Sequence, residues 1–157
     1  MKKKIIWLLV LVVIGGALFL ARSQMPAKNI QPLTEEQQVR ALVAELGKRL
    51  HQVSILAPTA VADIEKYYGD LISPELLAGW QKDPQRAPGL VTPNAWPDRI
   101  EIKQVERADD GAYDVQGQVI EVSRAGGSPV SSYSIIFKIR NRDGRWLITG
   151  CVKLVQQ

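Results

Sequence analysis

Cysteine and histidine are nearly missing from this sequence, since its 157 residues include one of each, Cys151 and His51. A single cysteine cannot close an intramolecular disulfide, so the folded part must be stabilised by its hydrophobic core alone. Neither residue has neighbouring ligands at the spacing of a zinc site, and we expect no metal and no cofactor. His51 follows the last residue of a helical apolar stripe, which indicates a helix-capping or surface histidine and not a general base.

An excess of positive charge is also missing once the N-terminal segment is set aside. The chain carries 20 Lys and Arg against 16 Asp and Glu, but the lysines at 2–4 and Arg22 supply four of the positive charges. Residues 1–22 contain no acid, so residues 23–157 hold sixteen charges of each sign. Nucleic-acid binding needs a basic surface that displaces counterions from phosphates. We therefore expect no nucleic-acid partner.

A long hydrophobic run is present near the N-terminus. Residues 5–21 are all apolar or glycine, with three lysines before them and Arg22 after them. A helix of this length spans about 25 Å, slightly less than the ~30 Å hydrocarbon core of a bilayer, and lysine snorkelling covers the difference. The charge asymmetry favours a cytoplasmic N-terminus. We therefore expect the chain to contact a membrane through residues 5–21.

The alternative for this segment is a cleaved secretory signal peptide, whose basic and apolar regions look the same in a sequence. The run is longer than a usual signal core, and the best small-residue cleavage site, Ala21-Arg22-Ser23, contains an arginine. Both features favour a retained anchor. The rest of the chain is exported in either case. We predict a membrane anchor at 1–22, a tether at 23–33 and an extracytoplasmic domain at 34–157.

Three helices are expected in the first half of that domain. Thr34 and Gln37 have the spacing of a capping box, and an apolar stripe with a helical period follows them. The stripe consists of Val39, Leu42, Val43, Leu46 and Leu50. A second amphipathic helix is indicated by Val61, Ile64, Tyr68 and Leu71. The pair Ser73-Pro74 predicts the start of a third helix, whose buried side would carry Leu76, Leu77 and Trp80.

The second half of the domain has the pattern of a sheet. Four prolines and Gly89 occupy residues 84–97, which we expect to form a long irregular loop. Beyond it the apolar period changes to two, in four segments separated by turns. Gly117 inside the second segment predicts a bulge there. The third segment alternates cleanly except at Ile136. We therefore expect helices that pack on a curved, four-stranded antiparallel sheet, which is an α+β fold.

This order of elements resembles the cone-shaped fold of the nuclear transport factor 2-like (NTF2-like) superfamily. The most telling local piece is Asp143-Gly144-Arg145-Trp146-Leu147-Ile148, which looks like the turn and strand that close many such domains. The resemblance covers residues 34–155. An anchor ahead of such a domain is similar to membrane-anchored components of bacterial conjugation machines. The superfamily contains isomerases, dehydratases, ligand binders and scaffolds, so the resemblance implies a fold and not one function.

No residue pattern here predicts catalytic residues. Asp63 and Tyr67 share a helical face, but the solvated side of the helix is the expected place for both. The aromatic residues are the best candidates for binding a ligand or partner: Tyr68, Trp80, Trp96 and Tyr133. Trp80 and Trp96 bracket the proline-rich loop and either fix it to the sheet or present it to a partner. For Trp146 we favour the packing role.

We expect a membrane-anchored binding or scaffold domain without catalysis, which contacts a protein partner or a second copy of the chain in an envelope or secretion and conjugation-type assembly. The alternative is a small-molecule binder or an isomerase-like or dehydratase-like enzyme that uses the concave sheet as a pocket. Clustered polar residues and a buried carboxylate inside the cone would favour the enzyme. A cone filled by Tyr133, Phe137 and leucines would favour the scaffold.

Overall fold

The computed structural model of the chain describes residues 32–125 and 127–154, and the folded unit begins at Leu33. Within these residues, three α-helices precede four β-strands, with two short 3-10 helices among them. The bounds are α2 Glu35–Arg49, η1 Leu50–Gln52, α3 Ala60–Tyr68, α4 Pro74–Lys82, η2 Pro84–Arg86, β1 Ala95–Arg107, β2 Tyr113–Ser123, β3 Pro129–Arg142 and β4 Arg145–Leu154. This arrangement confirms the predicted α+β fold.

The predicted anchor and all but the last two residues of the predicted tether lie outside the described residues. Within the described part of the chain, no helix combines the length and the apolar character needed to cross a membrane.

The first helix, α2, begins as its sequence predicts. The Gln37 backbone N–H donates to the Thr34 hydroxyl at 3.2 Å, and the Thr34 N–H donates to the Gln37 side-chain oxygen at 2.9 Å. This reciprocal pair satisfies two N–H groups that have no partner within the helix. The predicted stripe is buried along α2 and η1, apart from Leu42, which is half-buried. His51 lies in η1 and is exposed.

The second helix, α3, buries a face that differs by one position from the predicted one. Its buried residues are Ala60, Ile64 and Tyr68, which recur every four residues, whereas Val61 is 41% exposed. Val61 lies about 100° around the helix from Ala60 and therefore points away from the core. The prediction that Val61 belongs to the buried stripe is wrong.

The third helix, α4, has the predicted N-terminal cap. The Ser73 hydroxyl accepts a 3.3 Å hydrogen bond from the Leu76 N–H, and Pro74 occupies the first helical turn. Trp80 is buried, while Leu76 and Leu77 are only half-buried.

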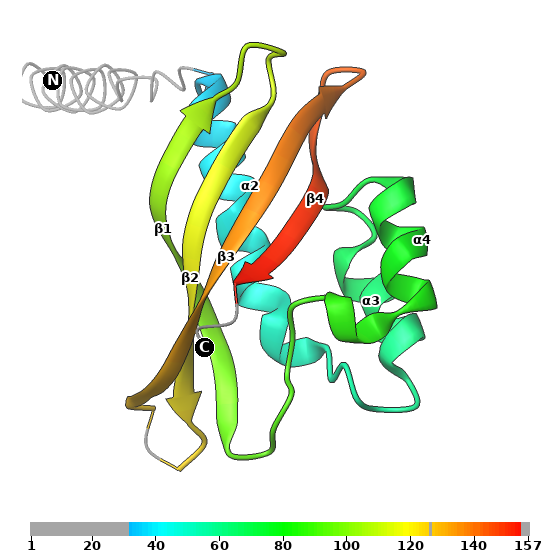
Figure 1. Cartoon of the computed structure of the whole chain (residues 1–157), viewed down its shortest axis with the longest axis vertical. Coiled ribbons are helices and arrows are strands. Elements are labelled where there is room, and N and C mark those ends of the chain that lie inside the picture. The colour runs from blue at the N-terminus through cyan, green and yellow to red at the C-terminus, as the bar shows by residue number, and fades with distance from the viewer. Residues whose placement is uncertain (1–31, 126, 155–157) are drawn as a thin grey trace, which may run out of the picture. The chain divides into compact units, whose positions relative to one another are not determined.

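The four strands form one antiparallel sheet in the order β1-β2-β3-β4, which confirms the predicted meander. In Figure 1, α2 lies behind the sheet, while α3 and α4 lie beyond the β4 edge. Side chains alternate between the two faces of a strand. The face toward α2, here called the inner face, includes Val115, Ile135 and Phe137, all fully buried. We call the opposite face the outer face.

The proline-rich segment is more regular than we predicted. Pro84–Arg86 forms the 3-10 helix η2, and β1 already begins at Ala95, so it includes Pro97. A proline lacks the N–H of a sheet ladder, but β1 is an edge strand with an irregular register between Pro97 and Arg99. The prediction of an irregular loop is therefore wrong at both ends of residues 84–97.

The predicted bulge lies opposite Gly117 instead of on it. The register shifts between Ile102 and Gln104, so Lys103 of β1 is the extra residue. The role of Gly117 is close packing, because a Cβ built there would lie 2.9 Å from Cγ2 of Ile100. The last turn has the predicted position, with Asp143 and Gly144 both at positive φ, 54° and 82°, as in a two-residue hairpin.

Candidate functional site

Two of the four aromatic residues singled out in the sequence meet at the end of α3. Tyr68 is fully buried, and its hydroxyl donates a 2.9 Å hydrogen bond to the Pro88 carbonyl oxygen. Its ring meets the buried Trp80 ring edge-to-face, with ring centroids 5.9 Å apart. Both aromatic rings therefore fix the segment that follows α4 to the body of the domain.

Tyr133 lies close to this pair on the inner face of β3, opposite Val119. Burial raises the pKa of Tyr133. Burial also raises the pKa of Tyr68, and the nearby Tyr133 and Cys151 raise it further. Burial also raises the pKa of the Cys151 thiol to about 12. All three groups are therefore neutral near pH 7, and the thiol is a poor nucleophile.

Lys153 completes this cluster, and our sequence reasoning missed it. Its ammonium donates hydrogen bonds to the carbonyl oxygens of Gln85 at 2.5 Å and Ala87 at 3.0 Å. Desolvation lowers its pKa. The sequence did contain one signal for Lys153: it lies two residues after Cys151 in the last strand and therefore on the same face of the sheet. The side-chain hydrogen bonds of Lys153 and Tyr68 thus fix the backbone of residues 84–88, which is a structural role for both side chains.

The inner face is filled with apolar side chains. Leu46, Leu50, Tyr68, Ile135 and Phe137 are all completely buried within one core cluster. Among the described residues, Ser73 is the one buried polar or charged side chain, and it caps α4. In the described part of the chain, the inner face therefore brings no fully buried carboxylate to Tyr68 or Tyr133, and Glu121, whose charge also raises the pKa of Tyr133, is half-buried.

Asp63 and Tyr67 do not form a reactive pair. The Asp63 carboxylate accepts a 2.8 Å hydrogen bond from the Thr59 hydroxyl, one turn earlier. Tyr67 is half-buried, and its backbone carbonyl accepts a hydrogen bond from Arg49 at 2.9 Å. Each residue thus has a local structural role.

Trp96 is separate from the other three aromatic residues. It pairs with Val122 near the start of β1, on the outer face, and its half-buried ring lies 5.0 Å below the Arg124 guanidinium. Its indole Nε1 is buried and has no hydrogen-bond partner within the described residues. Trp146 is buried against Tyr113 at 5.3 Å, in the packing role that we favoured for it.

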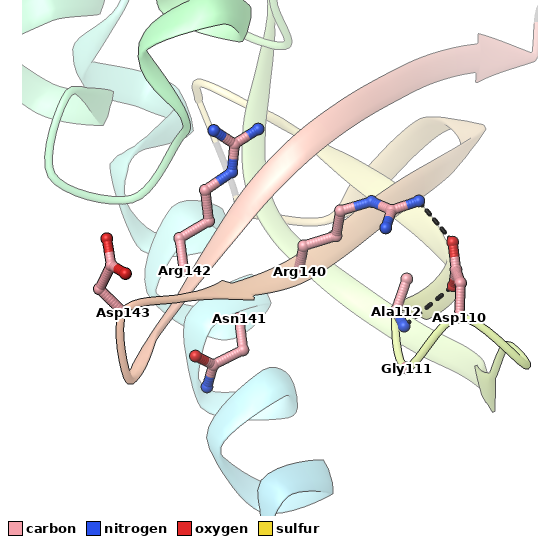
Figure 2. A pocket seen from close by; sticks show the side chains of 7 residues that line it. All are labelled: Asp110, Gly111, Ala112, Arg140, Asn141, Arg142 and Asp143. Carbon is pink, nitrogen blue, oxygen red and sulfur yellow. Dashed lines mark hydrogen bonds and ion pairs between the residues drawn. The ribbon is translucent and has the colours of Figure 1, made fainter.

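A hollow of about 640 Å³ opens where the β1–β2 and β3–β4 turns meet, and Figure 2 shows its lining. Arg140 contacts Asp110 at 2.5 Å, and the same carboxylate accepts the Ala112 N–H at 3.1 Å. The hydrogen bond from the Ala112 N–H has the largest effect, and together with the bond from Arg140 it lowers the pKa of Asp110. Arg142 is paired with Glu75 of α4 at 3.0 Å. The charged side chains of this hollow are therefore exposed and already paired, and such surface pairs contribute little free energy.

The outer face carries exposed apolar side chains that the sequence analysis did not single out as a candidate site. Ile136 pairs with Val152, and its neighbour Ser134 pairs with Leu154, so three aliphatic side chains lie together across β3 and β4. Val152 is 56% exposed and Leu154 is 45% exposed. We call Ile136, Val152 and Leu154 the outer-face patch. Contiguous exposed apolar patches of several hundred Å² are typical of protein contact sites.

Comparison with known proteins yields no relative. No family model matches the chain, and no curated protein or solved structure matches it. The resemblance to the NTF2-like superfamily therefore stays a prediction from the sequence pattern.

Proposed function

We propose that the chain is a membrane-anchored, extracytoplasmic binding or scaffold domain of NTF2-like type, which acts without catalysis as a subunit of an envelope or secretion and conjugation-type assembly. The apolar residues 5–21 and the basic residues before them support the anchor and its orientation. The order of helices and strands supports the NTF2-like type. The binding role depends on how apolar side chains are distributed over the two faces of the sheet.

That distribution is the observation that carries the proposal. On the inner face, where a cone-type enzyme would hold its substrate, Ile135 and Phe137 are completely buried and Tyr68 is bonded to Pro88. On the outer face, Val152 and Leu154 are exposed beside Ile136. A folded domain gains nothing from exposed aliphatic side chains, but a binding domain gains the hydrophobic energy of covering them, about 25 cal/mol per Å².

The experiment compares capture by the full-length chain in membranes. An epitope-tagged chain is cross-linked in intact cells and purified, in parallel with a variant that carries Val152→Lys and Leu154→Lys. The control variant carries Ala41→Lys and Ala44→Lys, which lie on the exposed side of α2. We expect the wild type and the control to capture the same proteins, and the patch variant to lose them.

Two results would contradict the proposal. Equal capture by both variants would exclude the outer-face patch as the contact surface. Turnover of a small molecule by the purified chain, lost on substitution of Tyr133 or Tyr68 but kept in the patch variant, would show an enzyme of the cone type.

A further inference from the structure

No described helix covers the outer face of the sheet. Figure 1 looks onto this face, with α2 behind the strands and the other described helices beyond β4. The register aligns two rows of outer-face residues across the sheet. One row is Gln104, Gln116, Ile136 and Val152, and the next is Glu101, Gln118, Ser134 and Leu154.

The centre of this face is free of charge. Across β2, β3 and β4 the two rows contain only amide, hydroxyl and aliphatic side chains. Charge begins one row away, at the Asp114 and Lys138 pair of β2 and β3, and at β1, where Glu101 is neutralised by Arg99 at 2.8 Å and Lys103 at 2.9 Å. In a two-fold symmetric interface a residue near the axis meets its own copy, so a charge there would face a like charge. The face satisfies this requirement.

The same face offers both a hollow and side chains that protrude. A hollow of about 200 Å³ is lined by Lys103 of β1 and by side chains that include Gln116, Gln118, Ser134, Ile136 and Leu154. Val152 stands next to this hollow in the row of Ile136 and is 56% exposed. A two-fold operation places the hollow of each copy opposite the protruding residues of the other. A hollow beside a protruding side chain is therefore compatible with a two-fold axis that runs between them.

The area fits a weak dimer. Strands about 4.8 Å apart, with roughly ten residues at about 3.3 Å each, give a four-stranded face a footprint of roughly 600 Å² per copy. Specific interfaces usually bury about 800 Å² per partner, so this face is at the lower end of that class. Such a dimer is weak in free solution. Two chains anchored in one membrane meet at a much higher effective concentration, which favours the pair.

We infer that the partner on the outer face is a second copy of this chain, and that the membrane-anchored protein is a dimer joined face to face through the outer-face patch. This inference rests on the proposed binding function and names its partner. It assigns Ser134 and Gln118 to the centre of the interface, where a large charged side chain would separate the two sheets.

Cysteine cross-linking in membranes tests the inference with the full-length chain. In a Cys151→Ala background, single cysteines are introduced by Val152→Cys or Ser134→Cys, and by Ala44→Cys on the exposed side of α2 as the control. A short bifunctional maleimide is added, and the dimer fraction is measured on denaturing gels. We expect at least tenfold more dimer from the outer-face cysteines than from the helix cysteine. Adding Ser134→Arg to Val152→Cys should reduce the dimer to the control level, and Gln118→Arg should do the same if Ser134→Arg impairs folding.

The remaining outcomes overturn the inference in distinguishable ways. Equal cross-linking at outer-face and helix positions would show random collision in the membrane. A cross-link from the outer face to a different protein, with no dimer, would exclude the second copy but leave the proposed binding function intact. No cross-link from either position to any protein would contradict the inference and the proposed function together.

Discussion

Replacing Tyr68 by phenylalanine tests whether the buried aromatic cluster is structural or functional. The change removes one hydroxyl whose 2.9 Å bond to the Pro88 carbonyl is buried, and it leaves that carbonyl without its donor. Leaving a buried acceptor unsatisfied costs about 1–3 kcal/mol of the free energy of unfolding. The ring and its contact with Trp80 stay in place, so no large cavity opens. For a domain of this size, we expect the melting temperature to fall by roughly 4–12 °C.

The assay is urea unfolding of residues 23–157, monitored by the fluorescence of the three tryptophans, of which Trp80 contacts Tyr68. Tyr67→Phe is the matched control, since the neighbouring tyrosine is half-buried and no hydrogen bond from its hydroxyl exists among the described residues. The control should unfold at the urea concentration of the wild type. If Tyr68→Phe unfolds like the wild type but loses partner capture in membranes, the structural role assigned to Tyr68 is refuted.

Four further predictions follow from the same structure and sequence. A reporter active only outside the cytoplasm should work when fused after Gln157, and activity of a cytoplasm-only reporter there would reverse the orientation. The isolated segment 23–157 should fold and show no salt-sensitive binding in a DNA retention assay. Gly89→Ala places a Cβ 2.6 Å from the Val53 carbonyl oxygen and should lower the free energy of unfolding in urea by about 1–3 kcal/mol. The matched substitution Gly79→Ala meets nothing within 4 Å and should raise the free energy of unfolding by about 0.5–1 kcal/mol. Burial raises the pKa of Cys151 from 9.0 to about 12, which lowers the thiolate fraction at pH 8 about 1,000-fold. A thiolate of higher pKa is a better nucleophile, which restores about 30-fold of the alkylation rate. Alkylation of Cys151 in the native chain should therefore be at least 30-fold slower than in urea.

The elements of the fold could be predicted because each has a local physical cause. The Thr34 and Gln37 pair satisfies N–H groups at the start of α2, and Ser73-Pro74 does the same for α4. Alternation of apolar and polar residues predicts strands because only a period of two separates the faces of a sheet. The Asp143-Gly144 turn needs positive φ at both residues, which few other residue pairs tolerate.

The errors occurred where a tertiary contact decides the local structure. Pro97 breaks a ladder in isolation, but its place in an edge strand depends on the order of strands in the complete sheet. Lys103 is the extra residue of the bulge, whereas Gly117 is needed for the close approach of Ile100, a contact between two strands that the sequence does not indicate. The hydrogen bonds of Lys153 to the chain after α4 connect residues more than sixty positions apart, and no local pattern indicates them.

The aromatic residues were selected as binding candidates by their type, and the structure packs three of them against the core: Tyr68 on α3, Trp80 on α4 and Tyr133 on the inner face of β3. Aromatic rings bury the most apolar surface per residue, so a core needs them as much as a binding site does. Residue type alone therefore cannot separate the two uses. Exposure separates them, because Tyr68 and Trp80 are buried while Val152 and Leu154 are not.

The proposed function depends on Ile136, which interrupts the alternation of apolar and polar residues in β3. At Ile136 the sequence places an aliphatic residue on the face where its neighbours Ser132, Ser134 and Lys138 are polar. Nothing in the fold requires this, since a serine or lysine at Ile136 would leave the inner face unchanged. Val152 stands beside it only through the register of β3 and β4, sixteen positions along the chain. Aliphatic residues that break the pattern on two strands and meet at one place are costly in a free domain, and such violations of local rules are expected where a protein works. Both changes lie on one surface and neither serves the core, and the proposed binding function therefore assigns the contact to the outer face.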